Sequence, residues 1–186
     1  YAFYRRVYDE VKHRVDNQIP AIPNEKYRML FVELPPWHSI GFFDRLAQRF
    51  GVAMAIESWS YHAIVPIPDE ELAGVHDPLE IIARIAFRKW TEFNDVALAY
   101  ELDPGIFMGG YLHYAKEYNI DGVFCHPLMS CRPATYTLLH AKNQLEEKLQ
   151  IPGVVVEGDI VDLRVFNEAE AFSKMEAFLE TMDHYR

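Results

Sequence analysis

Four short apolar runs alternate with longer segments that mix apolar and polar residues along most of the chain. The runs RMLFVEL, VAMAIES, DGVFCHPL and GVVVEGD occupy residues 28–34, 52–58, 121–128 and 153–159. Each run has the length of a strand, and its almost continuous apolar character indicates burial on both faces of a sheet. We therefore predict four buried strands.

Helical signals fill most of the segments between and after these strands. The segment SIGFFDRLAQRFG ends at Gly51, a residue type that commonly terminates helices. The segment DPLEIIARIAFRKWTEF begins with Asp77 as a potential cap and Pro78 at the first helical position. Further helices are predicted at residues 104–119, 133–150 and 167–182. The stretch 61–77, which contains prolines and acidic residues, is predicted to be a long surface loop.

An amphipathic helix is predicted at the start of the chain. Its apolar stripe consists of residues that recur at every fourth position, namely Phe3, Val7, Val11 and Val15. The segment NQIPAIPNEK that follows has the prolines and asparagines of a linker. We predict that residues 1–26 form a docking helix and a linker, and that residues 27–186 form the core of the domain.

The order of the predicted elements indicates the fold class. Strands alternate with helices, which is typical of an α/β fold with a flavodoxin-like parallel sheet. We predict four strands, or slightly more, with helices on both faces. A chain of 186 residues, 50% of them hydrophobic, is long enough for one well-packed domain.

Composition excludes several classes of function. The formal net charge is −10, from 18 basic and 28 acidic residues, which disfavours nucleic acid as a partner. No apolar stretch approaches the roughly 20 residues that cross a bilayer, so no membrane partner is predicted. Two cysteines are too few for a disulfide scaffold. A soluble, cytoplasmic protein is expected.

Chemically useful side chains follow the ends of the predicted strands. In parallel sheets, ligands bind outside the carboxyl ends of the strands, where these side chains would meet. They are Glu33, Trp37 and His38 after the first strand, Ser58, Trp59, Tyr61 and His62 after the second, Cys125, His126, Ser130, Cys131 and Arg132 at the third, and Glu157 and Asp159 at the fourth. The pattern predicts a binding site at this edge.

The two cysteines differ in their surroundings. Cys131 precedes a predicted helix and is followed by Arg132, so its thiolate would be stabilised for metal ligation or reactivity. A gap-filling role for Cys131 is an equally open alternative. Cys125 lies inside an apolar run and is interpreted as a core residue. Two cysteines six positions apart with one nearby histidine do not form a closed zinc site.

Other polar residues of this edge have alternative structural roles. Trp37 and His38 either contact a substrate or serve structure, with His38 capping the next helix, and Tyr61 and His62 leave the same choice. Glu157 and Asp159 either support the crevice from behind its lining residues or simply end a strand before a turn, and the second interpretation is adopted because such carboxylates are common. No G-x-G-x-x-G or Walker sequence follows the first strand, so nucleotide binding is not predicted.

Two stretches resemble a known family. Residues 121–162 resemble the C-terminal signature of 2-hydroxyacyl-CoA dehydratase and benzoyl-CoA reductase subunits. The shared features are a DGVI-type strand, a cysteine followed two positions later by proline, a helix, and an IP-x-apolar strand that ends in acid-x-D. Residues 28–61 resemble the strand, helix and strand that begin the second domain of such subunits. Together the two stretches cover most of the chain.

The resemblance implies that residues 1–186 are the C-terminal domain of a longer, two-domain subunit. It implies a [4Fe-4S] cluster held by cysteines of both domains, to which this chain contributes Cys131. Cys125 matches no ligand position of the family. Because a cluster needs several ligands, this chain on its own is expected to be cluster-free and inactive.

The resemblance also implies a reaction and partners. The reaction is radical dehydration of a 2-hydroxyacyl-CoA or reduction of an aromatic acyl-CoA, and the sequence does not distinguish the two. The partners are a related second subunit in a heterodimer, an ATP-dependent iron–sulfur activator protein and an acyl-CoA substrate. Trp37, His38, Tyr61 and His62 would line the substrate cleft. The alternatives are a noncatalytic α/β ligand-binding module or a structural paralogue, neither of which would need Cys131.

Overall fold

The described residues form a sheet of four parallel strands in the order β2-β1-β3-β4. The structure is a computed structural model that describes residues 1–58, 67–99 and 108–185. The strands are β1 (Tyr27–Val32), β2 (Val52–Glu57), β3 (Gly122–Cys125) and β4 (Gly153–Val155). The first strand lies between the second and the third, as in flavodoxin-like folds, so the predicted fold class is confirmed.

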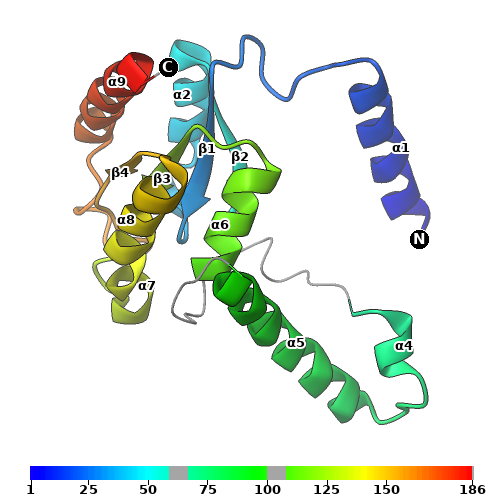
Figure 1. Cartoon of the computed structure of the whole chain (residues 1–186). Coiled ribbons are helices and arrows are strands. Elements are labelled where there is room, and N and C mark those ends of the chain that lie inside the picture. The colour runs from blue at the N-terminus through cyan, green and yellow to red at the C-terminus, as the bar shows by residue number, and fades with distance from the viewer. Residues whose placement is uncertain (59–66, 100–107, 186) are drawn as a thin grey trace.

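Helices cover both faces of the sheet (Figure 1). One face packs against α6 (Met108–Glu117) and α8 (Leu138–Leu149), and the other against α2 (Gly41–Phe50) and α9 (Glu168–Tyr185). Strand β1 serves both cores because successive side chains of a strand point to opposite faces. Leu30 and Val32 face α6 and α8, whereas Met29 and Phe31 face α2 and α9.

Gly51 ends α2 as the sequence predicts. Its φ of 68° is left-handed, and its N–H donates to the carbonyl of Ala47 at 2.9 Å. A Cβ at this position would also collide with the carbonyl oxygen of Asn24. Glycine is therefore required by both the conformation and the space available.

Two predicted elements differ in detail. The helix predicted at residues 133–150 is divided into α7 (Arg132–Tyr136) and α8, separated by Thr137. The hydroxyl of Thr135 donates to the carbonyl of Leu128 at 2.7 Å, which attaches α7 to the loop after β3. Within the predicted loop 61–77, the acidic residues of α4 (Asp69–Leu72) form one helical turn.

The amphipathic helices outside the sheet are largely exposed. Helix α1 (Ala2–Asp16) is set apart from the sheet in Figure 1, and none of its residues is buried. In this structure α1 buries none of its residues on the domain. That residues 1–26 form a docking helix and a linker stays a prediction, because an apolar stripe does not specify its partner surface. Helix α5 (Pro78–Ala99) contacts α6 but exposes Leu79 and Ile82.

The cap predicted for α5 is present. The side chain of Asp77 accepts a hydrogen bond from the N–H of Leu79 at 2.9 Å, and Pro78 is the first helical residue. None of the helices that the described residues form is long and apolar enough to cross a membrane.

Candidate functional site

The carboxyl ends of the strands bring several loops to one edge of the sheet. The chain reverses its direction of travel across the sheet between β1 and β3, and such switch points are where open α/β sheets bind ligands. The loop after β1 contains the 3-10 helix η1 (Trp37–Ser39), and the loop after β3 leads to Cys131. The loop after β4 contains Asp159.

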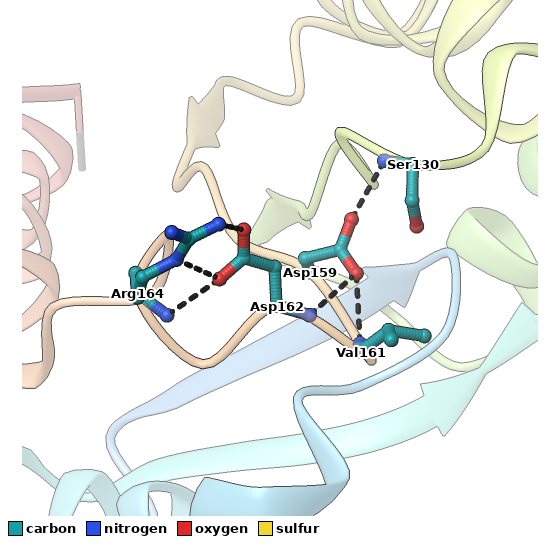
Figure 2. Close-up of polar contacts among 5 residues, drawn as sticks. All are labelled: Ser130, Asp159, Val161, Asp162 and Arg164. Carbon is teal, nitrogen blue, oxygen red and sulfur yellow. Dashed lines mark hydrogen bonds and ion pairs between the residues drawn. The ribbon is translucent and has the colours of Figure 1, made fainter.

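The carboxylate of Asp159 joins two of these loops (Figure 2). One oxygen accepts the N–H of Ser130 at 2.6 Å, and the other accepts the N–H groups of Val161 and Asp162 at 2.7 and 3.1 Å. Hydrogen bonding from Ser130, followed by that from Val161 and Asp162, holds the pKa of Asp159 well below its usual range. Asp159 is thus a buried, ionised carboxylate that main-chain donors satisfy.

His38 connects the loop after β1 to the same residue. Its Nε2 lies 3.0 Å from the carbonyl oxygen of Asp159, and its Nδ1 lies 2.9 Å from the hydroxyl of Ser39. Because a carbonyl only accepts, Nε2 carries a proton and donates to it, and in the neutral ring Nδ1 then accepts from the Ser39 hydroxyl. His38 does not cap α2, whose N-cap is Ile40, so the capping alternative is wrong.

His126 is a second link between loops, and it is fully buried. Its Nδ1 donates to the carbonyl of Leu34 at 2.8 Å, and among the described residues no group forms a hydrogen bond with Nε2. A Cβ at Gly158 would collide with this Nε2, so glycine permits the close approach of the two loops. Burial lowers the pKa of His126, which keeps the imidazole neutral.

Cys131 is partly exposed at this edge, at the start of α7. Its N–H donates to the carbonyl of Leu128 at 3.0 Å, and its carbonyl accepts the N–H of Thr135 at 3.2 Å. A shallow hollow of about 480 Å³ beside it is lined by Arg132, Pro133, Thr135 and Tyr136. Because α7 has only five residues, the stabilisation expected from a long helix dipole is much reduced.

Cys125 differs from Cys131 in its burial. It is fully buried in β3, as the sequence indicates, and belongs to the core formed with α6 and α8. Burial raises the pKa of its thiol to about 12, and the charge of Glu33 adds to the increase. A protonated, enclosed thiol is a poor metal ligand.

The predicted substrate-contact residues are only partly placed by the structure. Trp37 is 55% exposed on η1, so its indole is free to contact a ligand. Tyr61 and His62 lie outside the described residues. Glu157 forms an ion pair with Lys174 of α9.

Glu33, which the sequence placed at this edge, lies near Tyr111 of α6, which the sequence did not indicate. Glu33 has a φ of 83°, a backbone conformation that is uncommon for residues other than glycine. Its N–H donates to the Ser58 hydroxyl, with the nitrogen 3.4 Å from the oxygen. Burial, followed by the charge of Glu33, raises the pKa of Tyr111 well above its usual value. Tyr111 comes from α6, so only tertiary packing brings it near Glu33.

Large apolar side chains are exposed on the loops and helix starts of this edge. They are Trp37, Ile40, Met129, Tyr136, Leu139, Val161 and Leu163. Exposed apolar residues in such numbers suit contact with an organic ligand or another protein surface. Among residues 1–58, 67–99 and 108–185, no three His, Cys, Asp or Glu side chains are grouped so that they could hold a metal ion.

Comparison with known proteins gives consistent matches. Residues 1–182 match the family described as 2-hydroxyglutaryl-CoA dehydratase, D-component. A benzoyl-CoA reductase subunit from Thauera aromatica is 24% identical over 191 residues, which cover 99% of this chain and 42% of that protein. The (R)-2-hydroxyisocaproyl-CoA dehydratase alpha subunit from Clostridioides difficile is 24% identical over 163 residues, which cover 86% of this chain and 35% of that protein.

The chain spans less than half the length of these two relatives. The family match nevertheless extends over almost the whole chain, including both stretches whose sequence resembles the family. The parallel sheet confirms the fold that the resemblance implies. The chain therefore belongs to the 2-hydroxyglutaryl-CoA dehydratase D-component family.

Proposed function

We propose that this chain is part of an iron–sulfur enzyme that acts on acyl-CoA thioesters. The reaction is dehydration of a 2-hydroxyacyl-CoA or reduction of an aromatic acyl-CoA, the two activities named for the relatives. The observation that carries the proposal is the position of Cys131, partly exposed at the carboxyl edge of the sheet in a member of this family. Cys125, which is enclosed in the core, lacks that access.

Cys131 suits one ligand position of a [4Fe-4S] cluster. Its thiol is accessible, and the main-chain hydrogen bonds to Leu128 and Thr135 define the turn that carries it. Thiolates are the usual ligands of such clusters, and several are needed. The other ligands in this proposal lie outside the described residues. When bound, the cluster would supply a low-potential electron for the reaction.

The residues of this edge would bind and orient the substrate. Trp37 and the other exposed apolar side chains offer surface to the acyl group, and His38 holds the loop of Trp37 against the loop after β4. The side chains of Tyr61 and His62 remain proposed members of the same wall. The formal charge of −10 opposes the phosphates of coenzyme A, so basic groups are expected on the partner surface.

The proposal includes two protein partners. The relatives are named as subunits, which supports a related second subunit for this chain. An ATP-dependent iron–sulfur activator protein would deliver the electron, in keeping with the sequence resemblance. The acyl-CoA would then lie between the carboxyl edge of this sheet and surfaces outside the described residues.

The test compares variants of the two cysteines in the intact natural protein. The protein is produced in the absence of oxygen, together with the proposed second subunit. We expect iron, sulfide and the EPR signal of a [4Fe-4S] cluster in the wild type and in the Cys125→Ala control. In Cys131→Ala, the iron content should fall and the signal should be lost or altered, because one ligand is missing. Acyl-CoA substrates of both classes would then be assayed with the activator.

Two outcomes would contradict the proposal. If Cys131→Ala retained the iron content and EPR signal of the wild type, Cys131 would not be a ligand. A wild-type complex that holds no cluster after reconstitution with iron and sulfide would favour a noncatalytic binding or structural subunit.

A further inference from the structure

We propose that Asp159 is a positioning residue for Cys131: its carboxylate holds the Ser130–Cys131 segment against the loop after β4 and so sets the place of the thiol at the crevice. The inference rests on the proposed function, in which Cys131 is a cluster ligand. It concerns a buried side chain that does not itself reach a reacting group.

The two carboxylate oxygens of Asp159 accept hydrogen bonds from two different loops, which supports this role. One oxygen accepts the N–H groups of Val161 and Asp162 and thereby closes the turn in its own loop. That turn needs no second acceptor. The other oxygen accepts the N–H of Ser130, 29 positions earlier in the chain, at 2.6 Å. This second bond crosses between the loops, as Figure 2 shows.

The cross-loop bond lies next to the thiol in the sequence. Main-chain bonds already align the two loops, since Met129 donates to Gly158 at 3.2 Å and Gly158 donates to Pro127 at 3.4 Å. The bond from Ser130 to Asp159 is the next contact along the chain, and Cys131 follows it directly. Without it, the segment between Met129 and Cys131 would lose its hydrogen bond to the loop after β4.

The carboxylate of Asp159 is bonded by main-chain donors of both loops. Its oxygens meet three main-chain N–H groups, whereas the nearby Arg164 pairs with Asp162 at 2.7 Å (Figure 2). Charge-assisted hydrogen bonds of this kind are stronger than those between neutral groups. In Asp159→Asn, the single amide oxygen stays with the two donors of its own turn, as in an Asx-turn, so the NH₂ faces the N–H of Ser130 and the cross-loop bond is the one lost.

The neighbouring carboxylate provides a matched control. Asp162→Asn also removes one acidic group from the same loop, but the Asp162 side chain accepts its hydrogen bonds from Arg164 (Figure 2). This substitution therefore leaves the bond from Ser130 to Asp159 intact. A difference between the two variants reports the cross-loop bond rather than the net charge of the loop.

The experiment measures alkylation of the two cysteines by iodoacetamide in the intact natural protein after iron removal with a chelator. In Asp159→Asn we expect Cys131 to react several-fold faster than in the wild type, because the turn that carries it is released from the loop after β4. Asp162→Asn should react like the wild type. Cys125 should stay protected in all three proteins, and its labelling would reveal general unfolding.

A second readout uses the reconstituted complex. We expect Asp159→Asn to bind less iron or to show a shifted EPR signal, with Asp162→Asn unchanged. Equal Cys131 alkylation and an unchanged EPR signal in Asp159→Asn would overturn the inference. If Cys131→Ala kept its cluster while Asp159→Asn still accelerated alkylation, the proposed function would fail and the positioning role would stand.

Hydrogen exchange on the wild type provides a test that needs no variant. Ser130 is an exposed residue, but its amide is bonded to a buried carboxylate. We therefore expect slow exchange at the Ser130 amide, comparable to that of Val161 and Asp162. Rapid exchange at Ser130 with protected amides at the other two would show that the cross-loop bond does not persist in solution, and would overturn the proposal even if Asp159→Asn failed to fold.

Discussion

Helices α9 and α1 carry similar apolar stripes but have different surroundings. In α9, Ala171, Met175 and Leu179 recur at every fourth position, and all three are buried against the sheet. In α1, Val7 and Val11 have the same spacing and are 45% and 54% exposed. The periodicity of a helix thus predicts which of its faces is apolar, whereas the chain around it decides whether that face is covered.

The largest expected change in stability concerns the face of the sheet that α2 and α9 cover. Phe42 of α2 is fully buried, and its ring lies 4.9 Å from that of Phe172 and 5.5 Å from that of Phe166. We expect Phe42→Ala to lower the free energy of unfolding by about 3–5 kcal/mol. Val11→Ala on α1 should change it by less than about 0.5 kcal/mol, as is usual for exposed positions. Urea denaturation of both variants measures the difference.

A large effect of Val11→Ala would show that α1 is covered in solution. A small effect of Phe42→Ala would instead contradict the packing of α2 and α9 on their face of the sheet.

A smaller effect is expected where the loops after β3 and β4 approach each other. Gly158→Ala would place a Cβ against the Nε2 of His126. Because overpacking of this kind costs about 1–3 kcal/mol, the urea midpoint should fall. In a double-mutant cycle with His126→Ala, the alanine at 158 should cost much less, since the imidazole is absent. Additive effects would show that the two positions are not in contact.

The smallest expected effect is the pH dependence of the stability that Asp159 contributes. The folded pKa of Asp159 lies below its unfolded value of about 3.9, so its contribution to stability is present above that pH and is lost as the pH falls further. We expect the wild type to be more stable than Asp159→Asn at pH 7, with the difference shrinking below about pH 4. The folded pKa of His126 is also lowered, so this residue reduces the stability of both proteins as the pH falls below its unfolded pKa of about 6.5. Urea midpoints measured from pH 7 to pH 3 test this.

A constant difference between the two proteins over that range would contradict the ionised state of Asp159. It would leave the geometry of the loops as the only contribution of this residue to stability.

Much of the fold could be predicted because its signals are local. The apolar run around Met29 and Leu30 is long enough for a strand, and Gly51 has the conformation that ends a helix. The order of such elements then restricts the sheet to a few topologies. The docking of α1 could not be predicted in the same way, because it depends on surfaces distant in the sequence.

The candidate site was predicted in outline. The rule for parallel sheets indicated the correct edge for His38 and Cys131, and the apolar context of Cys125 indicated the core. The role of His126 was not foreseen, and support of the crevice by Asp159 was the alternative that was not adopted. Both roles depend on hydrogen bonds to Leu34 and Ser130, which lie 92 and 29 positions away in the chain.

The sequence by itself determined the strands, the helices, the two-sided core and the family, because these follow from periodicity, from residue types at the ends of elements and from short shared patterns. The tertiary structure alone decided which edge residues meet. Asp159, interpreted from the sequence as a turn carboxylate, closes its own turn and also holds the loop that carries Cys131. One carboxylate has two oxygens, and only the folded chain shows where the second one points.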